Sequence, residues 1–460
     1  MIAATPARTA VSVDRRLMLL ISPVYPAPIS KRLNPPTLRP TLRSSCMPPA
    51  LPVEIWQQIF DEVLDDPVVQ TSCSIDDFRR FIYAAGCESE VEARRLHLAA
   101  VCQSWRAIAE SYAHRSLVIS EYVTLSPGVS LYSVRRLCFK RRNRLHQRSK
   151  PLSAETLDRW SSWIKACQGL VVLDIDMGDD IDPTHPLKFL LACARSVKSL
   201  RSLRLRWDSS RYPVSLSLNN ISVSYFGITT LELGRLPPSV EPLSLPTLQV
   251  LIIEISEPSN PGWDFSKWRL PCLQYLSVLL GNSWEDTPFE LGVFQPFASH
   301  LVALHLTAAL WGHSPTVGYQ SPVLQSPVLP FDLNYFPSLQ DLTLCNIPLL
   351  ISTPLDIHHP LRTIRAKSWD QSAFFRLTYF PPNTFRTIQT ITICIECHFW
   401  GYSGGWQQDP SPFNSACASL DRLVLEENIS LRDKNGSTLE EWKKQVGWDD
   451  WFPSMEKYYS

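Results

Sequence analysis

Apolar residues recur along the chain in one short pattern, apolar-x-x-apolar-x-apolar, which occurs ten times from residue 170 onward. Within each copy apolar and polar positions alternate as in a half-buried strand, and successive copies begin 20 to 38 residues apart. An eleventh, capping copy precedes them at Val134-Leu137-Phe139. The ten copies are Leu170-Leu173-Ile175, Leu200-Leu203-Leu205, Ile228-Leu231-Leu233, Leu248-Leu251-Ile253, Leu273-Leu276-Val278, Leu301-Leu304-Leu306, Leu339-Leu342-Leu344, Leu361-Ile364-Ala366, Ile388-Ile391-Ile393 and Leu420-Leu423-Leu425.

This repetition predicts a stack of short parallel strands. The last two apolar residues of each copy would point inward, and the connecting chain would return on the outer side. No copy is stable alone, because only its neighbours bury its apolar side chains. We therefore expect an α/β fold with a parallel concave sheet, built as a solenoid that resembles leucine-rich repeats.

The polar strand positions of this sheet predict a binding surface. Ten strands about 4.8 Å apart give a face roughly 43 Å long, which is enough to hold a folded protein. Its residues share no chemical theme that would indicate the ligand, and any single one has the alternative of being an ordinary solvated strand residue. They are Asp174, Arg204, Glu232, Tyr275, His305, Thr343, Arg365 and Thr392, of which Arg204, Tyr275, His305 and Arg365 are our candidate substrate-binding residues.

Two helical patterns precede the repeats. In residues 51–64 the apolar positions 55, 56, 59, 60, 63 and 64 form one stripe, and Pro52 is tolerated in the first turn of a helix. In residues 98–109 the apolar positions 98, 101, 102, 105, 108 and 109 also follow one helical face. The two patterns predict helices that can pack on each other.

The same residues carry a resemblance to a known family. Leu-Pro-x-Glu-Ile-x-x-x-Ile-Phe, followed by Val-Cys-x-x-Trp-Arg-x-Ile-Ala, resembles the F-box. That resemblance implies a small helical module that docks on the Skp adaptor of a cullin-based ubiquitin ligase. The repeats are similar to the irregular leucine-rich repeats of fungal-type F-box proteins. By position, the adaptor contacts would be Leu51, Pro52, Ile55, Ile59, Leu98, Val101, Cys102 and Trp105.

The resemblance implies a substrate-recruiting subunit of a Skp/cullin/F-box ubiquitin ligase. The F-box would bind the Skp adaptor, and through it a cullin scaffold, while the repeats would bind a protein substrate. Such a subunit is not an enzyme. One alternative is a repeat scaffold outside any ligase, because the halves of the motif are separated by an insertion; another is that the two helical patterns are ordinary core helices.

Changes in composition divide the chain into five parts. Residues 1–46 are proline-rich with seven basic residues and one acid, which predicts a disordered tail, and Met47 is a second candidate start of translation. Near the other end, Ser437-x-x-Glu440 is a capping-box pattern. The parts are the tail (1–46), an F-box with an insertion at about 65–95 (47–117), a basic linker with the capping copy (118–169), the solenoid (170–430) and a C-terminal cap helix (431–460).

Charge and cysteine content limit the partners. Lys plus Arg and Asp plus Glu both number 44, which argues against nucleic acid and anionic membranes as partners. A local basic run, Arg135 to Lys150, is either a nuclear localisation or RNA-contacting segment or a solvated linker. Twelve scattered cysteines are typical of free thiols in a reducing compartment, and no run of 18 apolar residues is present. We expect a protein without membrane contact in the cytoplasm, the nucleus or both.

Enzymatic motifs are missing from the sequence. It contains no phosphate-binding loop, no serine-hydrolase elbow and no His-Glu-x-x-His motif, and its glycine content is low. Cys394-x-x-Cys397-His398 matches the pattern of haem attachment, but it directly follows a predicted strand, which explains the segment without haem. We expect no cofactor, no metal and no catalytic residue.

Overall fold

The computed structural model describes residues 52–64, 78, 87–112, 115–121, 125, 130–141, 152–178, 184–207, 217–236, 241–255, 263–280, 291–308, 329–345, 349–351, 359–368, 392–397, 430–433, 438 and 441. All of them belong to one compact unit, which begins at Val53, apart from Pro52 at its edge. The predicted tail, 1–46, lies outside the described residues.

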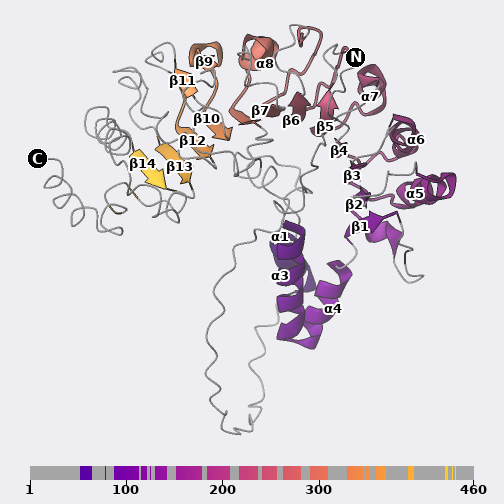
Figure 1. Cartoon of the computed structure of the whole chain (residues 1–460). Coiled ribbons are helices and arrows are strands. Elements are labelled where there is room, and N and C mark those ends of the chain that lie inside the picture. Colours follow the sequence, from indigo (N-terminus) through magenta and orange to yellow (C-terminus); the bar gives the residue numbers. More distant parts are fainter. Residues whose placement is uncertain are drawn as a thin grey trace, which may run out of the picture. The chain divides into compact units, whose positions relative to one another are not determined.

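A parallel sheet of twelve strands dominates this unit and follows an arc (Figure 1). Its strands are neighbours in chain order, except that β9 (Leu329–Phe331) and β11 (Leu349–Ile351) pair with each other in a small second sheet. The twelve are β1 (Ser116–Ser120), β2 (Arg136–Lys140), β3 (Val172–Asp176), β4 (Ser202–Arg206), β5 (Thr230–Leu236), β6 (Val250–Ile255), β7 (Tyr275–Leu280), β8 (Ala303–Ala308), β10 (Asp341–Cys345), β12 (Thr363–Ser368), β13 (Thr392–Cys397) and β14 (Ser430–Asp433).

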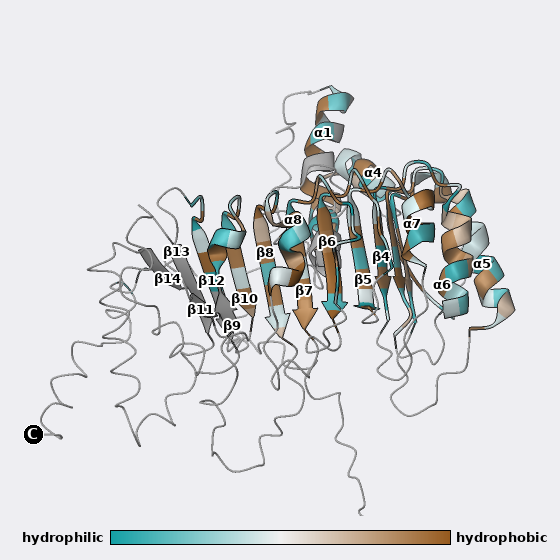
Figure 2. Cartoon of the chain, turned by 90° about the horizontal axis from the view of Figure 1, so that it is seen from above, coloured by the Kyte–Doolittle hydropathy of each residue, from teal (hydrophilic) through white to brown (hydrophobic). Residues whose placement is uncertain are grey.

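Two apolar side chains from each of the strands β2 to β8 and β10 build the core. Leu173 and Ile175 of β3, for example, are buried, and Leu173 is in register with Leu137 of β2 and Leu203 of β4. The same register continues strand by strand, so that apolar residues stack into rows along the sheet. Apolar residues are most concentrated along β6 and β7, which are largely brown in Figure 2. The core is therefore one continuous cluster, as the repeating pattern predicts.

Helices cover the outer side of the arc (Figure 1). They are α5 (Ala154–Ala166), α6 (Thr184–Ala194), α7 (Leu218–Ser224) and α8 (Gln295–Ala298), with short 3-10 helices η3 (Leu131–Ser133), η5 (Leu291–Phe294) and η7 (Leu333–Tyr335). Trp160 of α5 stacks on Phe139 of β2 with ring centroids 4.5 Å apart. The outer layer thus covers the apolar side of the sheet.

Side-chain hydroxyls connect successive turns of the stack. In three places among the described residues, a Ser or Thr three positions before a strand donates to a backbone carbonyl just before the neighbouring strand of the sheet. Each bond satisfies a turn carbonyl that the strand ladder leaves without a partner. These bonds join Ser199 to Leu170 (2.7 Å), Thr247 to Ile228 (2.8 Å) and Ser338 to Ser299 (2.7 Å).

Most of the predicted strands are confirmed. The eight copies from Leu170 through Leu361 coincide with β3, β4, β5, β6, β7, β8, β10 and β12, and the capping copy coincides with β2. β1 does not follow the pattern, because its first apolar position is occupied by His114. The two ends of the predicted array therefore need correction.

One of the last two predicted copies is misplaced. In β13, Ile393 is in register with Ile364, so this copy lies two residues later than Ile388-Ile391-Ile393. Apolar residues at 391, 393 and 395 fit two registers equally well, because side chains alternate with a period of two. The final strand is β14, whereas the predicted copy at 420–425 lies outside the described residues.

The predicted linker, 118–169, is largely part of the sheet unit, since it contains β2 and α5. In its basic run, Arg136 is buried beside Asp174, and Arg141 is buried with its Nε 3.6 Å from a Glu121 oxygen. The reading of the whole run as a solvated linker is therefore wrong for these two arginines.

The N-terminal helices form a module with a core of its own. They are α1 (Val53–Leu64), α3 (Cys87–Val101) and α4 (Gln103–Tyr112). The predicted second helix is two helices, because the chain breaks at Cys102, whose carbonyl accepts from Arg106 N–H and whose thiol accepts from Trp105 N–H at 3.4 Å. α3 begins at Cys87, within the segment predicted as an insertion, 65–95, most of which lies outside the described residues.

A capping box is present near the C-terminus, one residue later than predicted. The hydroxyl of Thr438 accepts from the Glu441 N–H at 3.3 Å, and the Glu441 carboxylate accepts from the Thr438 N–H at 2.7 Å. Thr438 and Glu441 thus form a reciprocal capping box, whereas the predicted Ser437 and Glu440 lie outside the described residues.

Candidate functional site

The face of the sheet turned away from α5 to α8, here called the inner face, holds the predicted substrate-binding residues. Arg204, His305 and Arg365 occupy one register row, on β4, β8 and β12. Tyr275 lies two residues earlier on β7, in the next row. The strand alternation therefore brings all four to the same face, as the sequence predicts.

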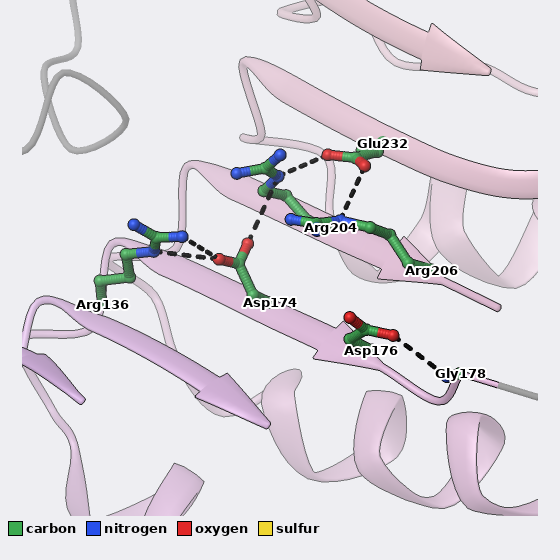
Figure 3. Close-up of polar contacts among 7 residues, drawn as sticks. All are labelled: Arg136, Asp174, Asp176, Gly178, Arg204, Arg206 and Glu232. Carbon is green, nitrogen blue, oxygen red and sulfur yellow. Dashed lines mark hydrogen bonds and ion pairs between the residues drawn. The ribbon is translucent and has the colours of Figure 1, made fainter. Parts of the chain in front are cut away.

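A ladder of opposite charges crosses the inner face from β2 to β5 (Figure 3). Asp174 lies between Arg136, which donates to its Oδ2 from Nε at 3.0 Å and Nη2 at 2.7 Å, and Arg204, whose Nε is 3.5 Å from Oδ1. Glu232 in turn accepts from the Nε of Arg204 and lies 2.8 Å from the Nε of Arg206. Every charge on this ladder faces an opposite charge on a neighbouring strand or residue.

The environment of Arg206 keeps its guanidinium charged. Burial alone would lower the pKa of Arg206, but Glu232, followed by Asp174 and Asp176, outweighs this effect and raises the pKa above its ordinary value. Arg204 and Asp174 are both buried. The charged side chains of the ladder therefore pair with one another. Of the four predicted substrate-binding residues, Arg204 thus has a structural role within the sheet.

Polar side chains cluster around His305 on β7, β8 and β10. The imidazole Nδ1 is 3.0 Å from Ser277 Oγ, and Nε2 is 3.2 Å from Thr307 Oγ1 and 3.3 Å from Cys345 Sγ. His305, Ser277 and Cys345 are all buried. A Cys–His pair of this kind can act on a substrate only if the substrate reaches the sulfur, so the burial favours a structural role.

Arg365 is the most accessible of the four predicted residues. Its Nε lies 4.0 Å from the Asp341 carboxylate, and its side chain is partly exposed. Asp341 also accepts from the Thr343 hydroxyl at 3.3 Å. Arg365 can thus contact a partner while Asp341 balances its charge.

An apolar patch lies next to the charge ladder and shares β7 and β8 with the His305 cluster. It consists of Val250 and Ile252 on β6, Tyr275 on β7 and Ala303 on β8, and Phe78 packs on it. The Phe78 and Tyr275 rings are 5.2 Å apart at 38°. Tyr275 is consequently buried and not free for a partner.

The predicted adaptor contacts on the helical module fall into two groups. Ile55 and Ile59 on α1 are each 38% exposed, and Val101 on α3 is 60% exposed. Pro52 and Cys102 are exposed as well, and Leu51 lies outside the described residues. Ile55, Ile59 and Val101 are here called the apolar surface of the module.

Leu98 and Trp105 belong to the second group, which packs inside the module. Trp105 contacts Trp56 and Phe60 edge-on, with ring centroids 5.0 and 5.5 Å apart, and Leu98 packs against the same core. These contacts hold α1 and α4 together. Leu98 and Trp105 therefore contribute to the core of the module.

Sequence reasoning missed Phe78, Ser277 and Cys345. Ser277 and Cys345 could have been found from the strand register, since Ser277 shares the row of His305 and Cys345 lies in the row of Thr307. Phe78 lies far from β7 in the chain, and no periodicity relates it to the sheet.

Within the part of the chain that the structure describes, no group of three His, Cys, Asp or Glu side chains could hold a metal ion. No helix among the described residues is long and apolar enough to cross a membrane.

Comparisons with known proteins add little. No family model matches the chain, and no curated protein matches it. Among solved structures, a Bacteroides fragilis protein from a structural-genomics programme covers 64% of this chain and 82% of its own, with 15% sequence identity and a TM-score of 0.29.

Proposed function

We propose that the protein is a substrate-recruiting subunit of a Skp/cullin/F-box ubiquitin ligase. Its helical module would be an F-box that binds the Skp adaptor, and its sheet unit would be a leucine-rich-repeat-like solenoid that binds a protein substrate. The subunit would act by proximity, because holding a substrate near a ubiquitin-carrying enzyme raises the effective concentration of the substrate's lysines.

The apolar surface of the module carries this proposal. Trp56, Phe60 and Trp105 already form an internal core, so Ile55 and Ile59 are not needed to hold the helices together. Exposed apolar side chains on a small helical module are typical of a docking surface. They stand in the Leu-Pro-x-Glu-Ile segment that resembles the F-box.

The inner face of the sheet supports the second half of the proposal. Its centre is apolar, and charged or polar groups flank it on both sides, which is the usual anatomy of a protein-binding surface. The partly exposed Arg365 offers a charged contact at one side. This arrangement fits a polypeptide ligand better than a small molecule.

Co-purification with a recombinant Skp-family adaptor tests the proposal. We expect the wild type to retain the adaptor and an Ile55→Asp, Ile59→Asp, Val101→Asp variant to lose it, because each substitution places a charge on the apolar surface. The control is Val223→Asp, which changes an exposed apolar residue on α7. This control should retain the adaptor.

Failure of the wild type to bind any adaptor would overturn the ligase assignment. The chain would then be better described as a protein-interaction scaffold outside a ligase. Circular dichroism of each variant ensures that lost binding is not caused by unfolding.

A further inference from the structure

Phe78 lies on the inner face although it belongs to the chain between α1 and α3. Its side chain is 2% exposed, and it packs against Val250, Tyr275 and Ala303, which come from three adjacent strands. An aromatic side chain is thus already seated at the centre of a face whose other residues are mostly polar.

The site beneath Phe78 has the composition of an anchor pocket. Val250 and Ala303 pack with the Phe78 ring, and Tyr275 meets that ring at 38°. In protein interfaces such central apolar sites take an aromatic anchor, and polar groups surround them. Here the polar residues Glu232 on β5 and Ser277 on β7 lie on either side of Ile252 in the same register row.

We propose that Val250, Ile252, Tyr275 and Ala303 form a recognition site for an aromatic side chain of a partner polypeptide, and that Phe78 occupies this site in cis until the partner displaces it. The proposal deepens the substrate-recruiting function proposed above and rests on it. A tethered ligand has a high effective concentration, so a partner in trans competes with Phe78 for every binding event.

The residues around Phe78 provide a probe. A fluorescently labelled peptide with the sequence of residues 74–82, Ser-Ile-Asp-Asp-Phe-Arg-Arg-Phe-Ile, presents the same aromatic side chain in trans. When Phe78 is replaced by Ala in the full-length protein, the site is vacant throughout. We expect this variant to bind the peptide at least about tenfold more tightly than the wild type, because apparent affinity scales with the vacant fraction.

Three controls make the measurement specific. A peptide with Ala in place of its first Phe should lose binding to the Phe78→Ala protein. Adding Tyr275→Ala to that protein should weaken binding of the unmodified peptide, because it removes one wall of the site. By contrast, Phe226→Ala, which changes an exposed aromatic residue near α7, should leave the affinity at the wild-type level.

A purely structural role for Phe78 gives a different result. The Phe78→Ala protein would then unfold at a lower temperature and show no saturable binding of the peptide, and the proposal would be wrong. If the alanine variant does not fold, Phe78→Leu retains apolar filling without the ring, and we expect it to bind the peptide more tightly than the wild type does.

Adaptor binding by the same preparations separates the two proposals. Peptide binding without adaptor binding would keep the recognition site and overturn the ligase function. Adaptor binding without peptide binding by a folded Phe78→Ala protein would keep the ligase function and overturn the recognition site.

Discussion

The guanidinium of Arg136 donates two hydrogen bonds to one oxygen of Asp174, across the boundary between β2 and β3. Both side chains are buried, and the other Asp174 oxygen faces Arg204 on β4. One carboxylate therefore balances two guanidiniums from two neighbouring strands. Buried ion pairs of this kind are costly to break, because the remaining partner keeps its charge without compensation.

We predict that Asp174→Asn lowers the free energy of unfolding by about 3 kcal/mol, since it removes the charge and keeps the shape. Chemical denaturation followed by circular dichroism measures the change. Asp176→Asn is the matched control on the same strand. Asp176 is partly exposed and accepts from Gly178 N–H, which an asparagine oxygen can also do, so its cost should stay below about 1 kcal/mol. Equal losses in the two variants would contradict the role given to the ladder.

Gly234 lies at the register shift between Leu233 and Arg235, where β5 approaches Trp207. A Cβ at this position would lie 3.0 Å from the backbone nitrogen of Trp207 and 3.2 Å from its carbonyl oxygen. Backbone atoms cannot move aside as a flexible side chain can. We predict that Gly234→Ala destabilises the protein by about 1–3 kcal/mol.

Gly292 provides the control for this substitution, because a Cβ there would meet nothing within 4 Å. Gly292→Ala should be neutral or stabilising by up to about 1 kcal/mol, since alanine restricts the unfolded chain. Thermal unfolding of both variants checks the pair. If Gly234→Ala unfolds at the wild-type temperature, the close approach to Trp207 is not a constraint.

The sheet could be predicted well where the apolar positions fix one register. Copies such as Leu342-Leu344 allow only one alignment, because the residues two positions away, Gln340 and Asn346, are polar. The register of β13 could not be determined from the sequence. Ile391-Ile393 and Ile393-Ile395 both fit the last two apolar positions of the repeat. The sequence therefore determines the register of a strand only where a shift by two residues would place a polar residue at a core position.

The inner face could be predicted only in part. Strand alternation places Arg204 and His305 on it correctly, but whether a polar residue is free or paired depends on its neighbours across the sheet. For Arg204 one such neighbour, Glu232, lies 28 residues away in the chain. The contact of Phe78 with Tyr275 spans a still longer separation, and no sequence pattern reports it.

The pH dependence of stability should contain a contribution from Cys167 at the end of α5. Burial raises the pKa of the Cys167 thiol to about 11, from an ordinary value near 9. Between these values the unfolded chain loses the proton and the folded chain keeps it. The free energy of unfolding should therefore fall as pH rises from about 9 to 11, by at most about 1.4 kcal/mol per pH unit for one proton.

Replacing Cys167 with Ala should flatten this part of the profile, whatever its effect on stability at pH 7. Cys272 is exposed, so Cys272→Ala should leave the slope unchanged. Denaturant titrations at several pH values between 8 and 11 compare the three proteins. A slope that Cys167→Ala leaves intact would assign the pH dependence to other groups.

Two residues of the helical module allow its stability and its adaptor binding to be tested separately. Trp105 packs on Trp56 and Phe60, whereas Ile59 is exposed on α1. We predict that Trp105→Ala destabilises the module by about 3 kcal/mol, and that Ile59→Ala changes its stability by less than about 0.5 kcal/mol. Hydrogen exchange of the amides in α1 and α4 reports the module alone, independently of the sheet.

The same two variants distinguish how adaptor binding is lost. If the apolar surface is the docking site, Ile59→Ala weakens adaptor binding while its amides stay protected, because only a surface contact is missing. Trp105→Ala weakens binding only together with faster exchange, since it acts through the fold of the module. Unchanged adaptor affinity in Ile59→Ala would place the docking site elsewhere on the module.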